Sequence, residues 1–172
     1  MKTIFLIAAL GVLLLLQTTH VSHAGGAPDA RDTHGQQADY AQLKADAERA
    51  YAQGSYARAN EIYSKVDKKN VTLAELRWIE FRLADTSWRA QAGSETADNT
   101  KYEEAQKQLE ELIRVAQKED ERDFVWAEAH ESLGDFFWTR RNQVNWSGAW
   151  PHYQQALDWW AGQRDLERAR VR

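Results

Sequence analysis

The stretch LADTSWR, Leu83 to Arg89, returns fifty residues later as LGDFFWTR, Leu133 to Arg140. Each copy has a leucine, a small residue, an aspartate, two further residues, a tryptophan and then an arginine. The flanks repeat too, as Tyr102-x-x-Ala105-x-x-x-Leu109 after the first copy and Tyr153-x-x-Ala156-x-x-x-Trp160 after the second. An earlier segment, Tyr56-x-x-Ala59-x-x-x-Tyr63, keeps only this second half. The chain therefore contains an internal repeat.

The spacing of apolar residues is helical from Asp39 onward. Leu76, Ile79 and Leu83 share one helical face, and Trp78, Phe81 and Trp88 lie on an adjoining one. A helix with two apolar faces is expected to lie between neighbours. Thr72-x-x-Glu75 and Thr100-x-x-Glu103 have the spacing of capping boxes. The sequence predicts an all-α chain with helices at about 40–53, 56–67, 73–91, 101–117, 121–141, 150–161 and from 165 onward.

The repeat resembles the tetratricopeptide repeat (TPR), whose signature runs W-x2-L-G-x2-Y, A-x3-F and P over 34 residues. In the last unit these positions are occupied by Leu133-Gly134 and by Ala156-x3-Trp160. In the middle unit they are occupied by Leu83-Ala84 and by Ala105-x3-Leu109. The closing proline is absent, and the segments Ala92 to Thr100 and Asn142 to Pro151 are insertions between paired helices. The resemblance implies an antiparallel helix-pair solenoid of about three pairs plus the start of a fourth.

Small residues at the repeat positions would let paired helices approach closely, and larger ones would fill the gaps between pairs. The predicted packing residues are Ala47, Ala59, Tyr63, Leu83, Ala84, Trp88, Ala105, Leu109, Leu133, Gly134, Trp138, Ala156 and Trp160.

The segments RWIEFRLADTSWR (Arg77 to Arg89) and ALDWWAGQRDLERAR (Ala156 to Arg170) also resemble the N-terminal repeat region of large secreted bacterial proteins of the alpha-2-macroglobulin type. Some of those proteins trap proteases through a thioester, which needs a cysteine, and this sequence has none. The resemblance implies that this chain is a leading segment without the trapping chemistry.

Residues 1–24 differ in composition from the rest. Lys2 precedes an apolar run of thirteen residues, Ile4 to Leu16, and Ser22-His23-Ala24 fits signal-peptidase cleavage before Gly25. A bilayer span needs about 20 apolar residues, so a signal peptide is favoured over an anchor. Residues 25–38 are small and polar, which predicts a flexible linker before a repeat domain at 39–172.

No catalytic or metal-binding motif is complete, so no cofactor is expected. His130-Glu131 begins like the zinc motif H-E-x-x-H, but Gly134 stands where the second histidine is needed. His130 is therefore predicted to be a packing or boundary residue. Asp85 and Asp135 occupy equivalent repeat positions about one repeat apart, too far to share a proton. They are expected to pair with arginines, Asp85 with Arg82 or Arg89 and Asp135 with Arg140.

All eight tryptophans lie between Trp78 and Trp160. Trp146 and Trp150 fall in the second insertion, where exposed rings could bind a protein partner or stack on sugars. The alternative, that the insertion folds back and buries them, is favoured because an exposed pair would be an apolar patch. Asn70 and Asn145 begin glycosylation sequons, which matter only in a eukaryotic source.

The formal net charge of −4, or −5 once Lys2 leaves with the signal peptide, argues against nucleic-acid binding. The sequence predicts a secreted or periplasmic non-enzymatic scaffold that binds a protein or peptide and has no membrane attachment. A protease-trapping protein's leading segment and a glycan-binding module are the alternatives. The short final helix predicts a domain that is incomplete at its C-terminal end, or that self-associates there.

Overall fold

The computed structural model describes residues 30–92, 98–139 and 144–163. Within these ranges the chain forms α-helices and two short 3-10 helices, and no strand. The α-helices are α1 (Ala30–Ala52), α2 (Tyr56–Tyr63), α3 (Leu73–Ala92), α4 (Asn99–Arg114), α5 (Phe124–Thr139) and α6 (Trp146–Gly162); the 3-10 helices are η1 (Lys68–Asn70) and η2 (Glu119–Glu121). The predicted all-α fold class is confirmed.

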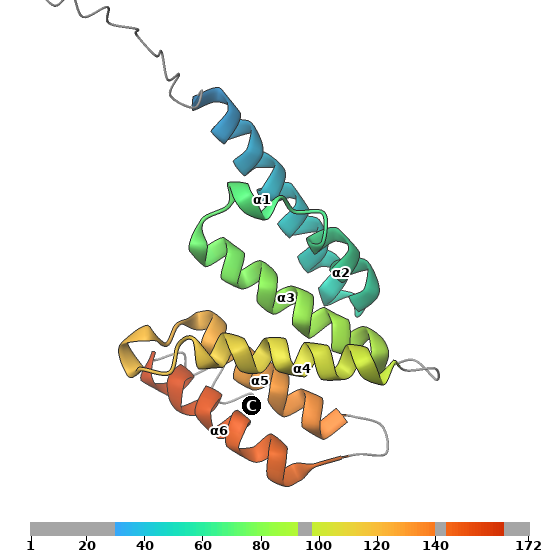
Figure 1. The fold of residues 1–172 in the computed structure, drawn as a ribbon, viewed down its shortest axis with the longest axis vertical. Coiled ribbons are helices and arrows are strands. Elements are labelled where there is room, and N and C mark those ends of the chain that lie inside the picture. The colour runs from blue at the N-terminus through green and yellow to red at the C-terminus, as the bar shows by residue number, and fades with distance from the viewer. Residues whose placement is uncertain (1–29, 93–97, 140–143, 164–172) are drawn as a thin grey trace, which may run out of the picture.

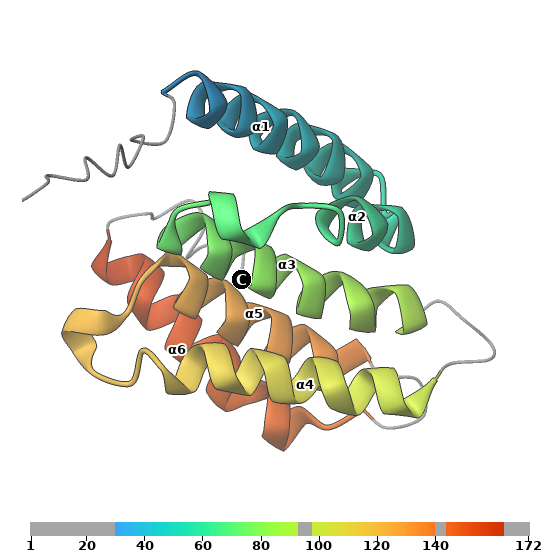
Figure 2. The same cartoon turned by 45° about the horizontal axis from the view of Figure 1, so that its top comes forward.

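The helices pack in neighbouring pairs, α1 with α2, α3 with α4 and α5 with α6, as Figure 1 shows. Successive pairs touch through the contacts of α2 with α3 and of α4 with α5, and α3 also packs directly on α5 (Figure 2). This is the order of a helical-repeat stack. The first helices of the three pairs are α1, α3 and α5, and α3 is the middle one. This order positions residues of α1, α3 and α5 at equivalent places along one row.

Local sequence explains where several helices begin and end. The predicted capping box precedes α3, because the Thr72 amide donates to Glu75 at 2.8 Å and the Glu75 amide to Thr72 Oγ1 at 3.3 Å. The box predicted at Thr100 does not form. Asp98 caps α4 instead, because its carboxylate accepts from the Thr100 amide at 2.9 Å.

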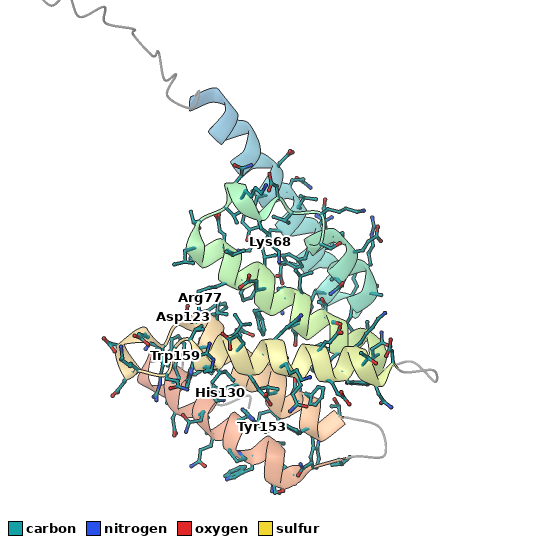
Figure 3. All side chains as sticks on the ribbon, in the orientation of Figure 1. Lys68, Arg77, Asp123, His130, Tyr153 and Trp159 are labelled. Atoms are coloured by element: carbon teal, nitrogen blue, oxygen red, sulfur yellow. The ribbon has the colours of Figure 1, made fainter. Side chains whose placement is uncertain are left out.

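The start of α5 is held by a cap residue that also binds an arginine of α3. Asp123 accepts from the Trp126 amide at 2.9 Å and thereby caps the helix. Arg77 on α3 donates to both oxygens of the same carboxylate, with Nε and one terminal nitrogen at 2.9 and 3.0 Å (Figure 3). One bidentate ion pair thus ties the first turn of α5 to the preceding helix pair.

Two predicted boundaries are wrong. Helix α1 begins at Ala30, so residues 30–38 of the predicted linker are helical; the polar, aperiodic composition there conceals good helix formers such as Gln36, Gln37 and Ala38. Helix α6 begins at Trp146 and not near Trp150, because Asn145 accepts from the Gly148 amide at 3.0 Å and caps it. Pro151 lies inside this helix. Residues 1–29 and the predicted final helix from 165 lie outside the described residues.

The predicted packing residues are buried, apart from Leu83, which is partly buried, and Trp138, which is exposed. Ala47, Ala59 and Tyr63 lie in the core between the first pair and α3. Trp88, Leu109 and Leu133 lie in the core between the second and third pairs. Ala156 and Trp160 belong to a third cluster, which α6 forms with the segment before and within α5.

Candidate functional site

A row of charged side chains crosses the three pairs at equivalent positions of α1, α3 and α5. At its centre Asp85 is fully buried, accepts from Arg89 Nε at 2.8 Å and from Ser132 Oγ at 2.6 Å, and lies 3.6 Å from Arg82. The predicted pairing of Asp85 with an arginine of its own helix therefore forms with both candidates.

The two arginines extend the row in opposite directions. Arg82 donates to both oxygens of Glu48 on α1, at 2.9 and 2.8 Å, and Arg89 donates to Asp135 on α5 at 2.7 Å. Burial alone would lower the pKa of Arg82, but the hydrogen bond and charge of Glu48 outweigh it and raise that pKa. Arg140, the partner predicted for Asp135, lies outside the described residues. We call the row Glu48–Arg82–Asp85–Arg89–Asp135 the charge ladder.

The charge ladder is poorly suited to acid–base catalysis. Each of its carboxylates accepts hydrogen bonds from arginine, and Asp135 also accepts from the Tyr153 hydroxyl at 2.7 Å. Asp85 and Asp135 are joined through Arg89 and share no proton. Carboxylates held in this way are neutralised by fixed cations and connect helices.

His130 is buried on α5 and packs against Trp126, with ring centroids 4.3 Å apart. Its Nδ1 lies 3.0 Å from Nδ1 of His152 on α6, so the two imidazoles share a hydrogen bond across the helix pair (Figure 3 labels His130). Burial, together with the charges of His152 and Arg122, lowers the pKa of His130 to about 3, and burial lowers that of His152. In the part of the chain that the structure describes, no three histidine, cysteine or acidic side chains cluster as metal ligands would.

Three tryptophans form an exposed patch where α5 ends and α6 begins. Trp138, Trp146 and Trp150 are 48%, 52% and 50% exposed. The ring centroids of Trp138 and Trp146 are 5.3 Å apart, and those of Trp146 and Trp150 are 5.4 Å apart. The backbone joins the two helix ends here, since the Asn145 amide donates to the Phe137 carbonyl at 2.8 Å. We call these three residues the tryptophan cluster.

Two sequence-based expectations fail at this cluster. Trp146 and Trp150 are not folded back over the third pair, because they stand four residues apart on one face of a capped helix. Trp138 is not in the core. Its repeat equivalent Trp88 is covered by α5, donating to Ser132 Oγ at 2.9 Å and packing on Phe136. Trp138 packs on Trp146 in the first turn of α6 and stays 48% exposed.

A groove of about 740 Å³ lies between the start of α2 and the end of α3, and continues to Thr139, the residue after Trp138. Its polar lining includes Tyr56, Arg58 and Arg89, and Arg89 is the member of the charge ladder that joins Asp85 to Asp135. No sequence motif indicates this groove, because its residues come from three separate helices and the turn before α2. The two members of the tryptophan cluster on α6 were detectable in the sequence through the Asn145 cap, which places Trp146 and Trp150 on one helical face.

None of the described helices combines the length and the hydrophobicity that a bilayer crossing needs. The chain matches no protein-family model, no curated protein and no solved structure. Its function must therefore be inferred from the tryptophan cluster, the groove and the buried polar contacts themselves.

Proposed function

We propose that this chain is a non-catalytic, TPR-like helical-repeat scaffold that binds a protein or peptide partner through the tryptophan cluster. The observation that carries the proposal is the half exposure of three contiguous indoles, Trp138, Trp146 and Trp150. Tryptophan is among the residues most enriched at the energetic centres of protein interfaces, because a rigid ring covers much area at a small entropic cost.

The cluster also has the rigid support that an interface anchor needs. Trp138 is at the end of α5, and the other two tryptophans are in the first turns of α6, where the Asn145 cap and its backbone bond to Phe137 hold the two helix ends together. The groove between α2 and α3 reaches Thr139, which follows Trp138 in the sequence. We propose that the partner is bound outside the cytoplasm, as the N-terminal residues 1–24 suggest.

A non-catalytic role is proposed because the polar side chains of the described region that could do chemistry are committed to structure. The carboxylates of the charge ladder are held by arginines. The two buried imidazoles hydrogen-bond to each other and not to a nucleophile or a carboxylate.

The test is a selection of binding peptides from a displayed library on the purified chain, followed by calorimetric titration of the selected peptides. The double variant Trp146→Ser, Trp150→Ser is expected to weaken binding about thirtyfold or more, which corresponds to a hot spot of about 2 kcal/mol. Leu73→Ser is the matched control, because Leu73 is 74% exposed but lies on the first turn of α3. Circular dichroism verifies that both variants keep their helices.

The same variants distinguish the glycan-binding alternative. A panel of neutral and acidic oligosaccharides is titrated in parallel. Glycan binding that is lost in the double variant, without any peptide binding, would replace the proposed function by carbohydrate recognition. Peptide binding that the double variant retains would remove the tryptophan cluster from the proposal.

A further inference from the structure

The imidazoles of His130 and His152 meet inside the α5–α6 pair, with their Nδ1 atoms 3.0 Å apart. At this distance one Nδ1 must carry a hydrogen and the other must accept it. Both rings can be neutral in this arrangement, one in each tautomer. The hydrogen bond therefore depends on one of the two Nδ1 atoms remaining unprotonated.

The surroundings of the pair do little to stabilise positive charge. Trp126 packs on His130, and Phe137 stacks on His152 with ring centroids 5.8 Å apart and planes inclined by 20°. The charged side chains that act on the pair do so in opposite directions. Arg122, ahead of α5, repels a charged His130, whereas Glu110 of α4 attracts a charged His152. Among the described residues, neither imidazole forms an ion pair with a carboxylate.

Protons must enter this pair in two steps. The first can bind at Nε2 of the donating ring and leaves the Nδ1–Nδ1 hydrogen bond in place. The second must bind at the accepting Nδ1, which removes the hydrogen bond and sets two cations against each other at the same site. Burial lowers the pKa values of both histidines, and the charge of His152 lowers that of His130 further, so the closed pair resists this step.

The first half of α6 connects the histidine pair to the tryptophan cluster. His152 stands two residues after Trp150, and its stacking partner Phe137 directly precedes Trp138. The Phe137 carbonyl also accepts the bond from Asn145 that holds the two helix ends together. Displacing His152 from α5 would therefore separate Trp146 and Trp150 from Trp138.

We propose that the His130–His152 pair makes the tryptophan cluster acid-sensitive: double protonation separates the first half of α6 from α5, disperses the cluster and releases the partner. The ligand-binding part of this statement rests on the proposed function, whereas the opening of α6 does not. The ordinary pKa of an exposed histidine is about 6.5. For each pH unit below this value, each of the two histidines can raise the population of the open state by up to about tenfold.

The opening is measured by amide hydrogen exchange on the chain without any partner, corrected for the intrinsic pH dependence of exchange. Between pH 6.5 and 5.0 the exchange of residues 145–152 is expected to rise about tenfold or more relative to that of α3. This window starts at the ordinary pKa of histidine, about 6.5, and extends below it.

The double variant His130→Asn, His152→Asn is the matched non-titrating pair, because an asparagine amide can donate or accept near the position of Nδ1. It is expected to remove the acid-induced rise in exchange. The histidine ring signals of the unmodified chain, followed by NMR, provide a second readout that does not depend on how the variant folds. If His130 and His152 titrate near pH 6.5 and the hydrogen exchange of residues 145–152 does not change, the proposal is overturned.

Binding is then measured at pH 7.5 and 5.0 with the peptide selected for the tryptophan cluster. Acid is expected to weaken binding to the unmodified chain at least tenfold more than to the double-asparagine variant. If α6 opens in acid but no peptide binds at either pH, the proposed function fails and the conformational switch stands. If binding depends on the cluster but is equally tight at both pH values, the switch fails and the function stands.

Discussion

Gly134 on α5 lies directly against the phenol ring of Tyr153 on α6. A Cβ atom built on Gly134 would stand 2.5 Å from the nearest ring carbon, closer than two carbons can approach without displacement. The Tyr153 hydroxyl donates to Asp135 at 2.7 Å, so the ring is held from its far end and has little freedom to withdraw. The absence of a side chain at Gly134 therefore sets the spacing of the third helix pair.

Gly134→Leu is expected to lower the free energy of unfolding by about 3 kcal/mol, because the new side chain must displace a ring that is hydrogen-bonded in place. Urea denaturation measures the change. Gly162→Ala is the matched control, since a Cβ there would meet no atom within 4 Å, and it should leave stability unchanged or slightly higher. Equal stability of the Gly134 variant and the parent would contradict the close packing of α5 on α6.

Asp85→Asn is expected to destabilise the fold by about 3 kcal/mol, since it removes the buried charge between Arg82 and Arg89. The same measurement on Asp46→Asn supplies the comparison. Asp46 also accepts from an arginine, Arg49 at 2.8 Å, but does so at the surface, where the loss should be small. Similar losses in the two variants would show that burial adds nothing to the centre of the charge ladder.

Trp88→Ala and Trp138→Ala should differ strongly although the two tryptophans are equivalent in the repeat. Trp88 is 1% exposed and loses both its packing on Phe136 and its bond to Ser132, which should cost about 3–5 kcal/mol. Trp138 is half exposed, and its removal should cost about 1 kcal/mol, the value of its contact with Trp146. The melting temperatures of both variants measure this difference. An equal fall in melting temperature would mean that Trp138 contributes to the core as much as Trp88 does.

Stability is expected to fall as the pH falls from about 6.5 toward 3. The folded chain holds His130 with a pKa of about 3, chiefly because of burial, whereas the unfolded chain has the ordinary value near 6.5. Between these values the unfolded state binds more protons, so acid favours unfolding, by up to about 1.4 kcal/mol per pH unit for one such histidine.

Urea titrations at pH 6.5, 5.5 and 5.0 measure this slope for the whole fold. His130→Asn, His152→Asn should flatten it, and an unchanged slope in that variant would assign the acid sensitivity to other groups.

The helix pairing could be predicted from the sequence because close packing restricts residue type. Ala84 and Ala156 are buried, Gly134 lies against the ring of Tyr153, and the larger Tyr63 and Leu109 are buried in the core clusters. The exposure of Trp138 could not be predicted in the same way. Repeat position identifies the side of a helix, but burial depends on whether another helix covers that side, as α5 covers Trp88.

The candidate site was only partly visible in the sequence. Trp146 and Trp150 stood out by composition, but a loop was expected where Asn145 starts a helix. His130 is expected from the sequence to be a packing or boundary residue, and it is buried, while its pairing with His152 depends on how α5 and α6 align. That alignment is set by contacts such as Gly134 on Tyr153, which residue spacing along one helix does not specify.

The charge ladder has a consequence for how the three pairs could be rearranged. Both of its arginines are on α3, while α1 and α5 contribute only acidic partners, Glu48 and Asp135. A chimera that placed the first pair directly against the third would bring two carboxylates together with no cation between them. The pairs are therefore not interchangeable modules. The two arginines of the middle pair favour an order in which that pair separates the other two.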